Sequence, residues 1–138
     1  MALTEFATED VVTTSADTDL RDVIEQMDEH DVGSVVIVDD DELTGIVTDR
    51  MIAMAFTSAE SVDEVSLDDI MTTDPVTIEV DATHFEALET MSDQGIRRLP
   101  VTENGSITGI ISLDDLIVVT ASELSMISDV VEQQAGPL

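Results

Sequence analysis

Apolar residues along the chain follow two patterns, one with helical spacing and one of short continuous runs. Helical spacing relates four apolar residues, Leu20, Val23, Ile24 and Met27, and therefore predicts a helix. The side-chain oxygens of Ser15–Asp17 precede this helix and are expected to cap its N-terminus. Ser34–Val38 is instead a short β-branched run, which is typical of a strand buried on both faces. The acidic turn Asp39–Glu42 follows, so Leu43–Val47 is predicted to be the return strand of a hairpin.

The remaining elements complete two similar series. They are short helical turns near Leu3 and Phe6 and over 67–71, brief strands over 11–14 and 75–78, helices over 48–56, 83–92 and 113–131, and strands over 98–102 and 106–111. Phe85, Leu88 and Met91 are predicted to form the inner side of the helix over 83–92. Asn104–Gly105 predicts a tight hairpin turn, whose central positions need positive φ. Each series therefore reads strand, helix, strand, strand, helix.

The two series are copies of one another. A shift of 64 positions places Thr44–Gly45–Ile46 on Thr108–Gly109–Ile110, and most of the chain aligns without a gap. A repeat of this length is one supersecondary unit used twice. A three-stranded sheet with helices on one face leaves its other face to be covered, and the second copy can cover it. We therefore expect an α/β (α+β) fold in which two pseudo-symmetric β-α-β-β-α units pack sheet to sheet.

The charge balance indicates where such a protein works. The 138 residues include 32 acidic and four basic ones, a net charge of −28, and no lysine. Repulsion of this size destabilises a compact state in dilute buffer, whereas concentrated salt shortens the Debye length to about 3 Å at 1 M. The 43% of apolar residues argues against a disordered acidic chain. We expect a cytoplasmic protein of a halophilic archaeon, with neither nucleic acid nor an anionic membrane as partner.

Several classes are excluded by what the sequence lacks. Without Cys there is no disulfide framework and no zinc–sulfur site. The N-terminal stretch has no basic region followed by a long apolar run, and no apolar stretch approaches the ~20 residues that span a bilayer, so neither a secretory signal nor a membrane segment is expected. No nucleophile–base set, phosphate loop or metal cluster stands out, so we expect no enzyme, no cofactor and no metal site.

The order of brief strand, helix ending in Met, Gly-x-Val-Val strand, acidic turn and Gly-Ile-Val-Thr-Asp-Arg segment resembles the CBS domain. The whole chain resembles a tandem CBS pair, or Bateman module. The resemblance divides it into repeat 1 over 3–58, a linker over 59–66, repeat 2 over 67–122, and a C-terminal helix and tail over 123–138. It implies two clefts between the repeats that bind adenosine-containing ligands such as AMP, ADP, ATP or S-adenosylmethionine. It also implies a homodimer formed through the CBS pair, which regulates another protein.

One cleft is expected at the start of the last helix. Ser112 and Asp115 stand three residues apart, on one side of a helical turn, where a carboxylate can accept ribose hydroxyls. With Gly109 they match the family's motif in full. The resemblance implies a ribose and adenine cleft of repeat 2 lined by Thr72, Val76, Leu99, Pro100, Gly109, Ile110, Ser112 and Asp115. A serine N-cap with acidic first-turn residues, binding nothing, explains the same pair.

The cleft of repeat 1 departs from the motif, because Met51 stands where the carboxylate is expected. A thioether cannot accept two ribose hydroxyls in its place. The resemblance instead brings Arg97 and Arg98 to this cleft, and guanidinium groups suit phosphate oxygens, although ion pairs with the many carboxylates explain them equally well. The candidates of this cleft are Val12, Gly45, Thr48, Arg50, Arg97 and Arg98. The other cleft would be faced by the uncharged Gly33 and Ser34.

Two functions remain open at this point. The first is a regulatory sensor that binds an adenine nucleotide or S-adenosylmethionine between the repeats. The second is a CBS pair without ligand that serves as a dimerisation or protein-interaction module. The complete motif of repeat 2 favours the first function, and the altered motif of repeat 1 favours the second.

Lowering the salt concentration below about 0.5 M should loosen or unfold the protein, because the net charge of −28 is then screened less effectively. Far-UV circular dichroism melts in low and multimolar KCl measure this effect. A cooperative melt that stays unchanged across that range would refute the prediction.

Overall fold

A computed structural model describes residues 3–8 and 11–135. Its α-helices are α1 (Leu20–His30), α2 (Asp49–Ala55), α3 (Leu67–Ile70), α4 (His84–Gln94) and α5 (Leu113–Ala135), with short 3-10 turns η1 (Leu3–Glu5) and η2 (Val62–Glu64). Its strands are β1 (Thr13–Thr14), β2 (Ser34–Asp39), β3 (Glu42–Thr48), β4 (Thr72–Thr73), β5 (Ile78–Glu79), β6 (Arg98–Glu103) and β7 (Ser106–Ser112). The predicted order of strand, helix, strand, strand, helix is confirmed in both halves. Strand β4 was not predicted, and β5 begins later than expected.

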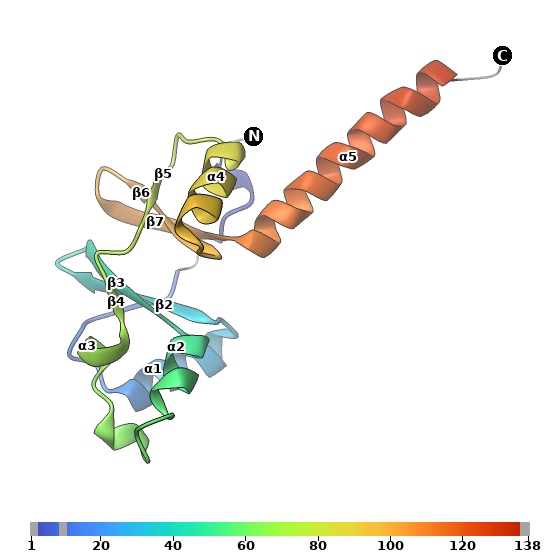
Figure 1. Cartoon of the computed structure of the whole chain (residues 1–138). Coiled ribbons are helices and arrows are strands. Elements are labelled where there is room, and N and C mark those ends of the chain that lie inside the picture. Colours follow the sequence, from blue (N-terminus) through green and yellow to red (C-terminus); the bar gives the residue numbers. More distant parts are fainter. Residues whose placement is uncertain (1–2, 9–10, 136–138) are drawn as a thin grey trace.

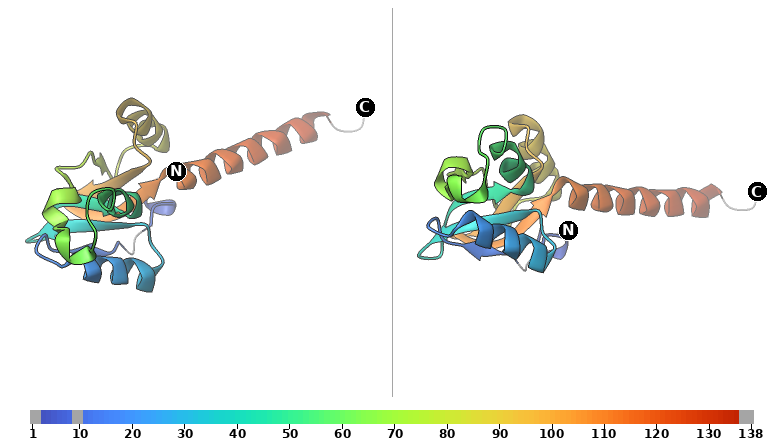
Figure 2. Two further views of the ribbon diagram at one scale, coloured as in Figure 1. Left: turned by 60° about the horizontal axis from the view of Figure 1, so that its bottom comes forward. Right: turned by 90° about the horizontal axis from the view of Figure 1, so that it is seen from below.

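The strands of the two repeats are paired in the same way. β1 runs parallel to β2, and β2 runs antiparallel to β3; β5, β6 and β7 repeat this arrangement. The repeats join at the pair Glu42–Ser106, where β3 meets β7. Helices α1, α2 and α3 lie on one side of the strands and α4 lies on the other (Figure 1). In the turned views, α5 extends away from the strands and from the other helices (Figure 2).

Each repeat buries apolar side chains on both faces of its strands. Val35 and Ile37 of β2 point into the core beneath α1 and α2. Val36 lies between them, so strand alternation directs it to the other face, where it is also fully buried. Pro100, which stands 64 positions later, is buried in the same way in β6. The strands form one continuous path, β1-β2-β3-β7-β6-β5 with β4 beside β3. Its two three-stranded halves cover one another through these buried faces, which confirms the predicted sheet-to-sheet packing.

The leading segment of each repeat packs into the core of the other repeat. Leu3 is fully buried among core residues of repeat 2 such as Leu99. Leu67, its equivalent 64 positions later, is 2% exposed in the core of repeat 1 beside residues such as Val23. The linker expected over 59–66 also contributes, since Val62 packs against the core of repeat 1. The expected boundaries at 3–58 and 67–122 divide the sequence into its two repeats. The two packed cores differ from this division, because each core takes its first segment from the other repeat.

Backbone bridges fix this exchange. Thr8 pairs antiparallel with Ile110 of β7, with N–H to O distances of 2.9 and 3.0 Å. At the equivalent place in the other direction, Thr72 of β4 pairs with Ile46 of β3. Each segment that leads into a repeat therefore pairs its backbone with a strand of the opposite repeat, Thr8 through a single bridge and Thr72 as part of β4.

Two glycines allow the bridges to approach closely. A Cβ on Gly109 would lie 2.9 Å from the carbonyl oxygen of Thr8, and one on Gly45 would lie 3.0 Å from that of Thr72. Both obstacles are backbone atoms, which cannot turn away as a flexible side chain could. The glycine of each repeated Thr-Gly-Ile is therefore required by the exchange.

The prediction that Phe85 and Leu88 point inward is wrong. These side chains are 62% and 41% exposed, and α4 instead buries Ala87 and Met91. Thr83 caps the helix through a capping box, which fixes its start and therefore the face that meets the sheet. A small residue at that face lets α4 lie close to the strands.

The predicted cap of α1 is also wrong. Asp19 stands at the N-cap, whereas Ser15 and Thr18 close a turn through a 3.1 Å backbone hydrogen bond that precedes the helix. The predicted hairpin turn is confirmed, with φ of 53° at Asn104 and 85° at Gly105.

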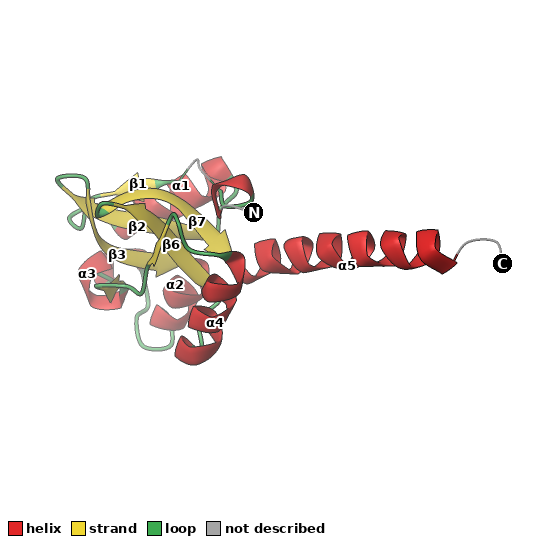
Figure 3. Cartoon of the chain, turned by 90° about the horizontal axis from the view of Figure 1, so that it is seen from above, coloured by secondary structure: helices red, strands yellow, loops and turns green. Residues whose placement is uncertain are grey.

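Helix α5 continues through residue 122, where the sequence suggested an end of repeat 2, and reaches Ala135. It projects from the body as an arm (Figure 3). Within residues 3–8 and 11–135, no helix combines the length and the apolar character needed to cross a membrane.

Replacement of Gly109 by Ala should lower the free energy of unfolding by about 1–3 kcal/mol, because the new methyl group would press on the Thr8 backbone. Urea unfolding in multimolar KCl measures the change. Ser106→Ala is the control, since Ser106 is exposed on the same strand. Equal stability of the two variants would mean that the first segment does not lie against β7.

Candidate functional site

The first of two clefts lies between the start of α2 and the loop that connects α4 to β6, and has a volume of about 320 Å³. Its apolar wall is formed by Ile46, Pro75, Val76, Ile96 and Pro100. Its polar side chains are Thr48, Arg50, Thr72, Arg97 and Arg98. Three of the four basic residues of the chain therefore line one cleft. An apolar wall beside a cationic rim can hold a flat ring together with an anionic group.

Met51 occupies the position in the first cleft where the family motif has a carboxylate. Thr48 caps α2, accepting a 3.2 Å hydrogen bond from the Met51 backbone N–H. The Thr72 hydroxyl points toward the Met51 sulfur at 3.9 Å, across the cleft. The thioether is also packed against the core of repeat 1. The hydroxyls of Thr48 and Thr72 are therefore the uncharged polar groups that this cleft offers.

The arginine side chains of this rim are weakly engaged by acidic groups. Arg97 Nη2 lies 3.9 Å from Asp114 Oδ1, and the two side chains are 74% and 82% exposed. An ion pair so long and so exposed contributes little to stability. The Leu113 N–H donates to the Arg97 carbonyl at 2.7 Å, which holds the backbone that presents Arg97. Arg97 is thus positioned through its backbone while its guanidinium stays accessible.

The second cleft is smaller, about 200 Å³, and lies at the start of α5. Repeat 2 contributes Ile110, Ser112 and Asp115, and the exchanged N-terminal segment contributes Thr8. Val12 belongs to repeat 1, where its carbonyl accepts a hydrogen bond from the Val36 N–H of β2. The strand that follows α1 contributes Gly33 and Ser34 from the facing side.

Ser112 and Asp115 form a reciprocal pair of hydrogen bonds. The Asp115 N–H donates to Ser112 Oγ at 3.1 Å, and the Ser112 N–H donates to Asp115 Oδ2 at 2.8 Å. This is the geometry of a capping box, which stabilises the first turn of α5. One carboxylate oxygen of Asp115 is therefore engaged in the helix cap, as the non-binding interpretation of the pair predicts, and a ligand would have to use the other.

Arg98 lines both clefts, so the expectation that the second cleft is faced only by uncharged groups is wrong. A Cβ on Gly33 would lie 2.8 Å from Arg98 Nη2 and 3.1 Å from Asp49 Oδ2. The missing side chain of Gly33 therefore leaves room for the guanidinium. The charge available to the second cleft depends on which way Arg98 extends.

The structure moves several predicted site residues from one cleft to the other. Thr72 and Val76, assigned to the cleft of repeat 2, line the first cleft together with Pro100, whereas Val12 lines the second. The exchange of leading segments explains the placement of Thr72, which pairs with β3 of repeat 1. Leu99 lies in neither cleft lining, because it is fully buried in the core of repeat 2. Gly45 and Gly109 contact the exchanged backbone rather than a cleft surface. The remaining candidates, Thr48, Arg50, Arg97, Arg98, Ile110, Ser112 and Asp115, lie in the cleft where they were expected, with Arg98 in both.

Sequence reasoning also missed some lining residues. Thr8 and Val32 line the second cleft, and they align with Thr72 and Ile96 of the first. The shift of 64 positions relates the residues of each pair. To place them in the clefts, one must also know that the leading segments are exchanged.

Known proteins contain the same unit. The model of the CBS domain matches residues 3–58 and 67–131. An uncharacterized protein of Methanopyrus kandleri is 39% identical over 118 residues, which cover 83% of this chain and 60% of that protein. The CBS domain-containing protein YhcV of Bacillus subtilis is 30% identical over 111 residues, covering 80% and 79%. The chain therefore spans less than two thirds of the length of the first of these relatives.

A solved structure has the same fold. It is the CBS domain pair of protein MJ0100 in complex with 5′-methylthioadenosine and S-adenosyl-L-methionine. The TM-score is 0.81 at 20% identity, and the match covers 89% of this chain and 98% of that one. This likeness shows the fold, and the matches to the domain model in both halves show the family. The chain therefore belongs to the CBS-domain family, as a tandem pair of CBS domains.

Proposed function

We propose that this CBS pair is a sensor that holds an adenosine-containing ligand with phosphate groups, such as ATP, ADP or AMP, in the first cleft. The observation that carries the proposal is the placement of Arg50, Arg97 and Arg98 around one cleft. In a chain with 32 acidic residues, an anion is repelled by most of the surface, so a local cluster of cations marks where it can bind.

The shape and lining of the first cleft support this ligand class. Its volume of about 320 Å³ falls at the lower end of ordinary ligand pockets, about 300–1,000 Å³. Val76, Ile96 and Pro100 offer an apolar surface to an adenine ring, and Thr48 and Thr72 offer hydroxyls to the ribose. Guanidinium groups bind phosphate oxygens through paired hydrogen bonds, which depend less on long-range attraction and therefore persist in concentrated salt.

The second cleft, in this proposal, is a weaker site for an adenosine ligand without phosphates. Asp115 has one carboxylate oxygen outside its hydrogen bond to Ser112, and that oxygen can accept a ribose hydroxyl. The complex of MJ0100 with 5′-methylthioadenosine and S-adenosyl-L-methionine supports an adenosine ligand without phosphates for such a cleft. Because Arg98 lines both clefts, a phosphate ligand that draws Arg98 into the first changes the charge of the second.

The setting follows from the composition. The net charge of −28 supports a cytoplasmic protein of a halophilic archaeon, in which the module reports nucleotide levels to a regulated protein. A homodimer formed through the CBS pair is part of this proposal.

Arg97→Gln should weaken ATP binding by about 10–100-fold, since a hydrogen bond to a charged group contributes about 1.5–3 kcal/mol. Adenosine binding should change little, because the lost contact is to phosphate. Titration calorimetry in multimolar KCl with ATP, AMP and adenosine measures both. Arg21→Gln is the matched control: it removes the same charge, and Arg21 lies on a different surface, beside Asp19 and Asp22.

Equal loss of ATP affinity in Arg97→Gln and Arg21→Gln would reduce the effect to net charge and contradict the site. If the unsubstituted protein binds none of ATP, ADP, AMP, adenosine or S-adenosylmethionine at millimolar concentration, the CBS pair without ligand is the better description.

Asp115→Ala should lower the free energy of unfolding by about 0.5–2 kcal/mol, because it removes one half of the α5 capping box. ATP affinity should stay unchanged, since Asp115 does not line the first cleft. Urea unfolding and calorimetry on the same sample measure the two effects. A large loss of ATP affinity at unchanged stability would transfer the ATP site to the second cleft.

A further inference from the structure

Helix α5 presents large apolar side chains along an arm that projects from the body (Figures 1 and 2). Its 23 residues span about 35 Å at 1.5 Å per residue. Leu124, Ile127 and Val131 are 62%, 59% and 61% exposed. Most of the stability of a helix in a protein comes from packing its apolar face, and β-branched residues such as Ile127 and Val131 add little intrinsic helix propensity. The arm therefore needs a covering surface.

The spacing of these residues indicates what kind of surface that is. Along α5, one stripe repeats at alternating intervals of four and three residues: Leu113, Ile117, Thr120, Leu124, Ile127 and Val131. Alternating intervals of four and three residues are the a and d positions of a seven-residue repeat, the seam along which two helices pack in a left-handed coiled coil. We name these six residues the α5 seam.

The charges on α5 favour a second copy of the chain as the other helix. The acidic residues of α5 all lie outside the seam, at Asp114, Asp115, Glu123, Asp129 and Glu132. Two copies with a net charge of −28 each repel one another over most of their surfaces, so they can meet best along a stripe that carries no acid. A basic partner would instead be attracted to the acidic surface outside the seam, where the opposite charges lie.

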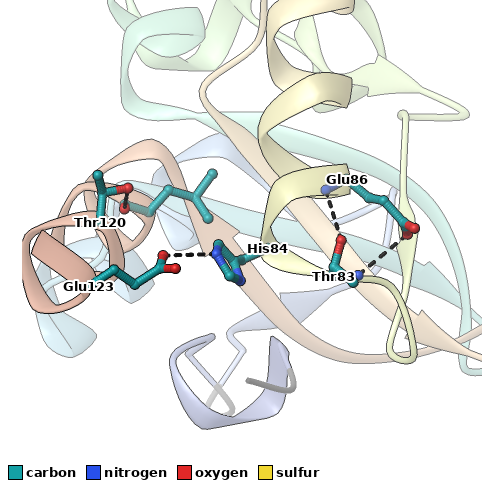
Figure 4. A network of polar contacts seen from close by, with 6 residues as sticks. Thr83, His84, Glu86, Thr120 and Glu123 are labelled. Carbon is teal, nitrogen blue, oxygen red and sulfur yellow. Dashed lines mark hydrogen bonds and ion pairs between the residues drawn. The ribbon is translucent and has the colours of Figure 1, made fainter. Parts of the chain in front are cut away.

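The base of the arm is fixed to the body and continues the apolar surface. His84 Nε2 of α4 lies 2.9 Å from Glu123 Oε1 of α5, so this acid is turned toward the body (Figure 4). An apolar groove of about 370 Å³ lies beside it, lined by Leu88, Ile117, Thr120 and Leu124 among others. The exposed Leu88, which does not serve the core of its own repeat, thereby extends the seam onto α4.

We propose that α5 pairs with α5 of a second copy of this chain, as a two-stranded coiled coil along the α5 seam. This surface is distinct from any contact between the CBS bodies. Two identical seams supply each other with the apolar cover that the arm needs.

The test compares two single substitutions in the full chain by sedimentation velocity over a range of protein concentrations in multimolar KCl. Leu124→Glu places a carboxylate in the centre of the seam and should weaken self-association on the order of 100-fold. Met126→Glu is the matched control, because it adds the same charge two residues away, at a side chain that is 53% exposed and outside the seam. The control should associate as the unsubstituted chain does.

The expected result is a loss of one association step in Leu124→Glu, with far-UV and thermal-melt signals of the body retained. Thr120→Leu provides a gain in the same experiment, since it replaces the polar member of the seam and should tighten association about tenfold. The proposal is overturned if the unsubstituted chain is monomeric at all concentrations, if both Glu variants behave alike, or if Thr120→Leu leaves association unchanged.

Discussion

The two short antiparallel bridges between the repeats, Thr8 with Ile110 and Thr72 with Ile46, are the constraint on which the rest of the structure depends. Because each leading segment crosses to the opposite repeat, neither core is complete without the other half of the chain. The bridges also hold the sheets face to face, which covers residues such as Val36. Contacts of this separation in sequence link the two cores, so the body is expected to unfold as one unit.

The same exchange builds both clefts. A cleft is walled on one side by the start of the helix that closes a repeat and on the other by a segment that the exchange brings across. Thr72 therefore faces Met51, although 20 positions of sequence lie between them. Any change that displaced the leading segments would remove a wall of a cleft and a part of a core together, which couples ligand binding to the stability of the whole body.

The sequence predicted much of the fold because its repeat is a periodic signal that local rules can read. The strands, the hairpin turn at Asn104–Gly105 and the helix expected over 48–56 all follow from nearby residues. The wrong predictions concern effects that are not local. Phe85 was placed inside by its spacing from Leu88 and Met91, whereas the packing of α4 in the core buries Ala87 and Met91 instead. Residues were assigned to clefts by repeat because the pattern shows that two copies exist and does not show which segments cross between them.

The difference between the two clefts has an electrostatic sense. Thr48 and Ser112 cap equivalent helices. Of these two capping residues, within the described part of the chain, only Ser112 also donates its backbone N–H to a carboxylate, that of Asp115. The short helix α2 does without that bond, since it is only seven residues long and packs through Ile52. Met51 therefore removes a negative charge from the cleft that three arginines line, where a carboxylate would pair with a guanidinium and compete with phosphate. In the proposed function, this departure from the motif would lose a ribose contact and spare the arginines a competing carboxylate, so the two clefts would suit ligands of different charge.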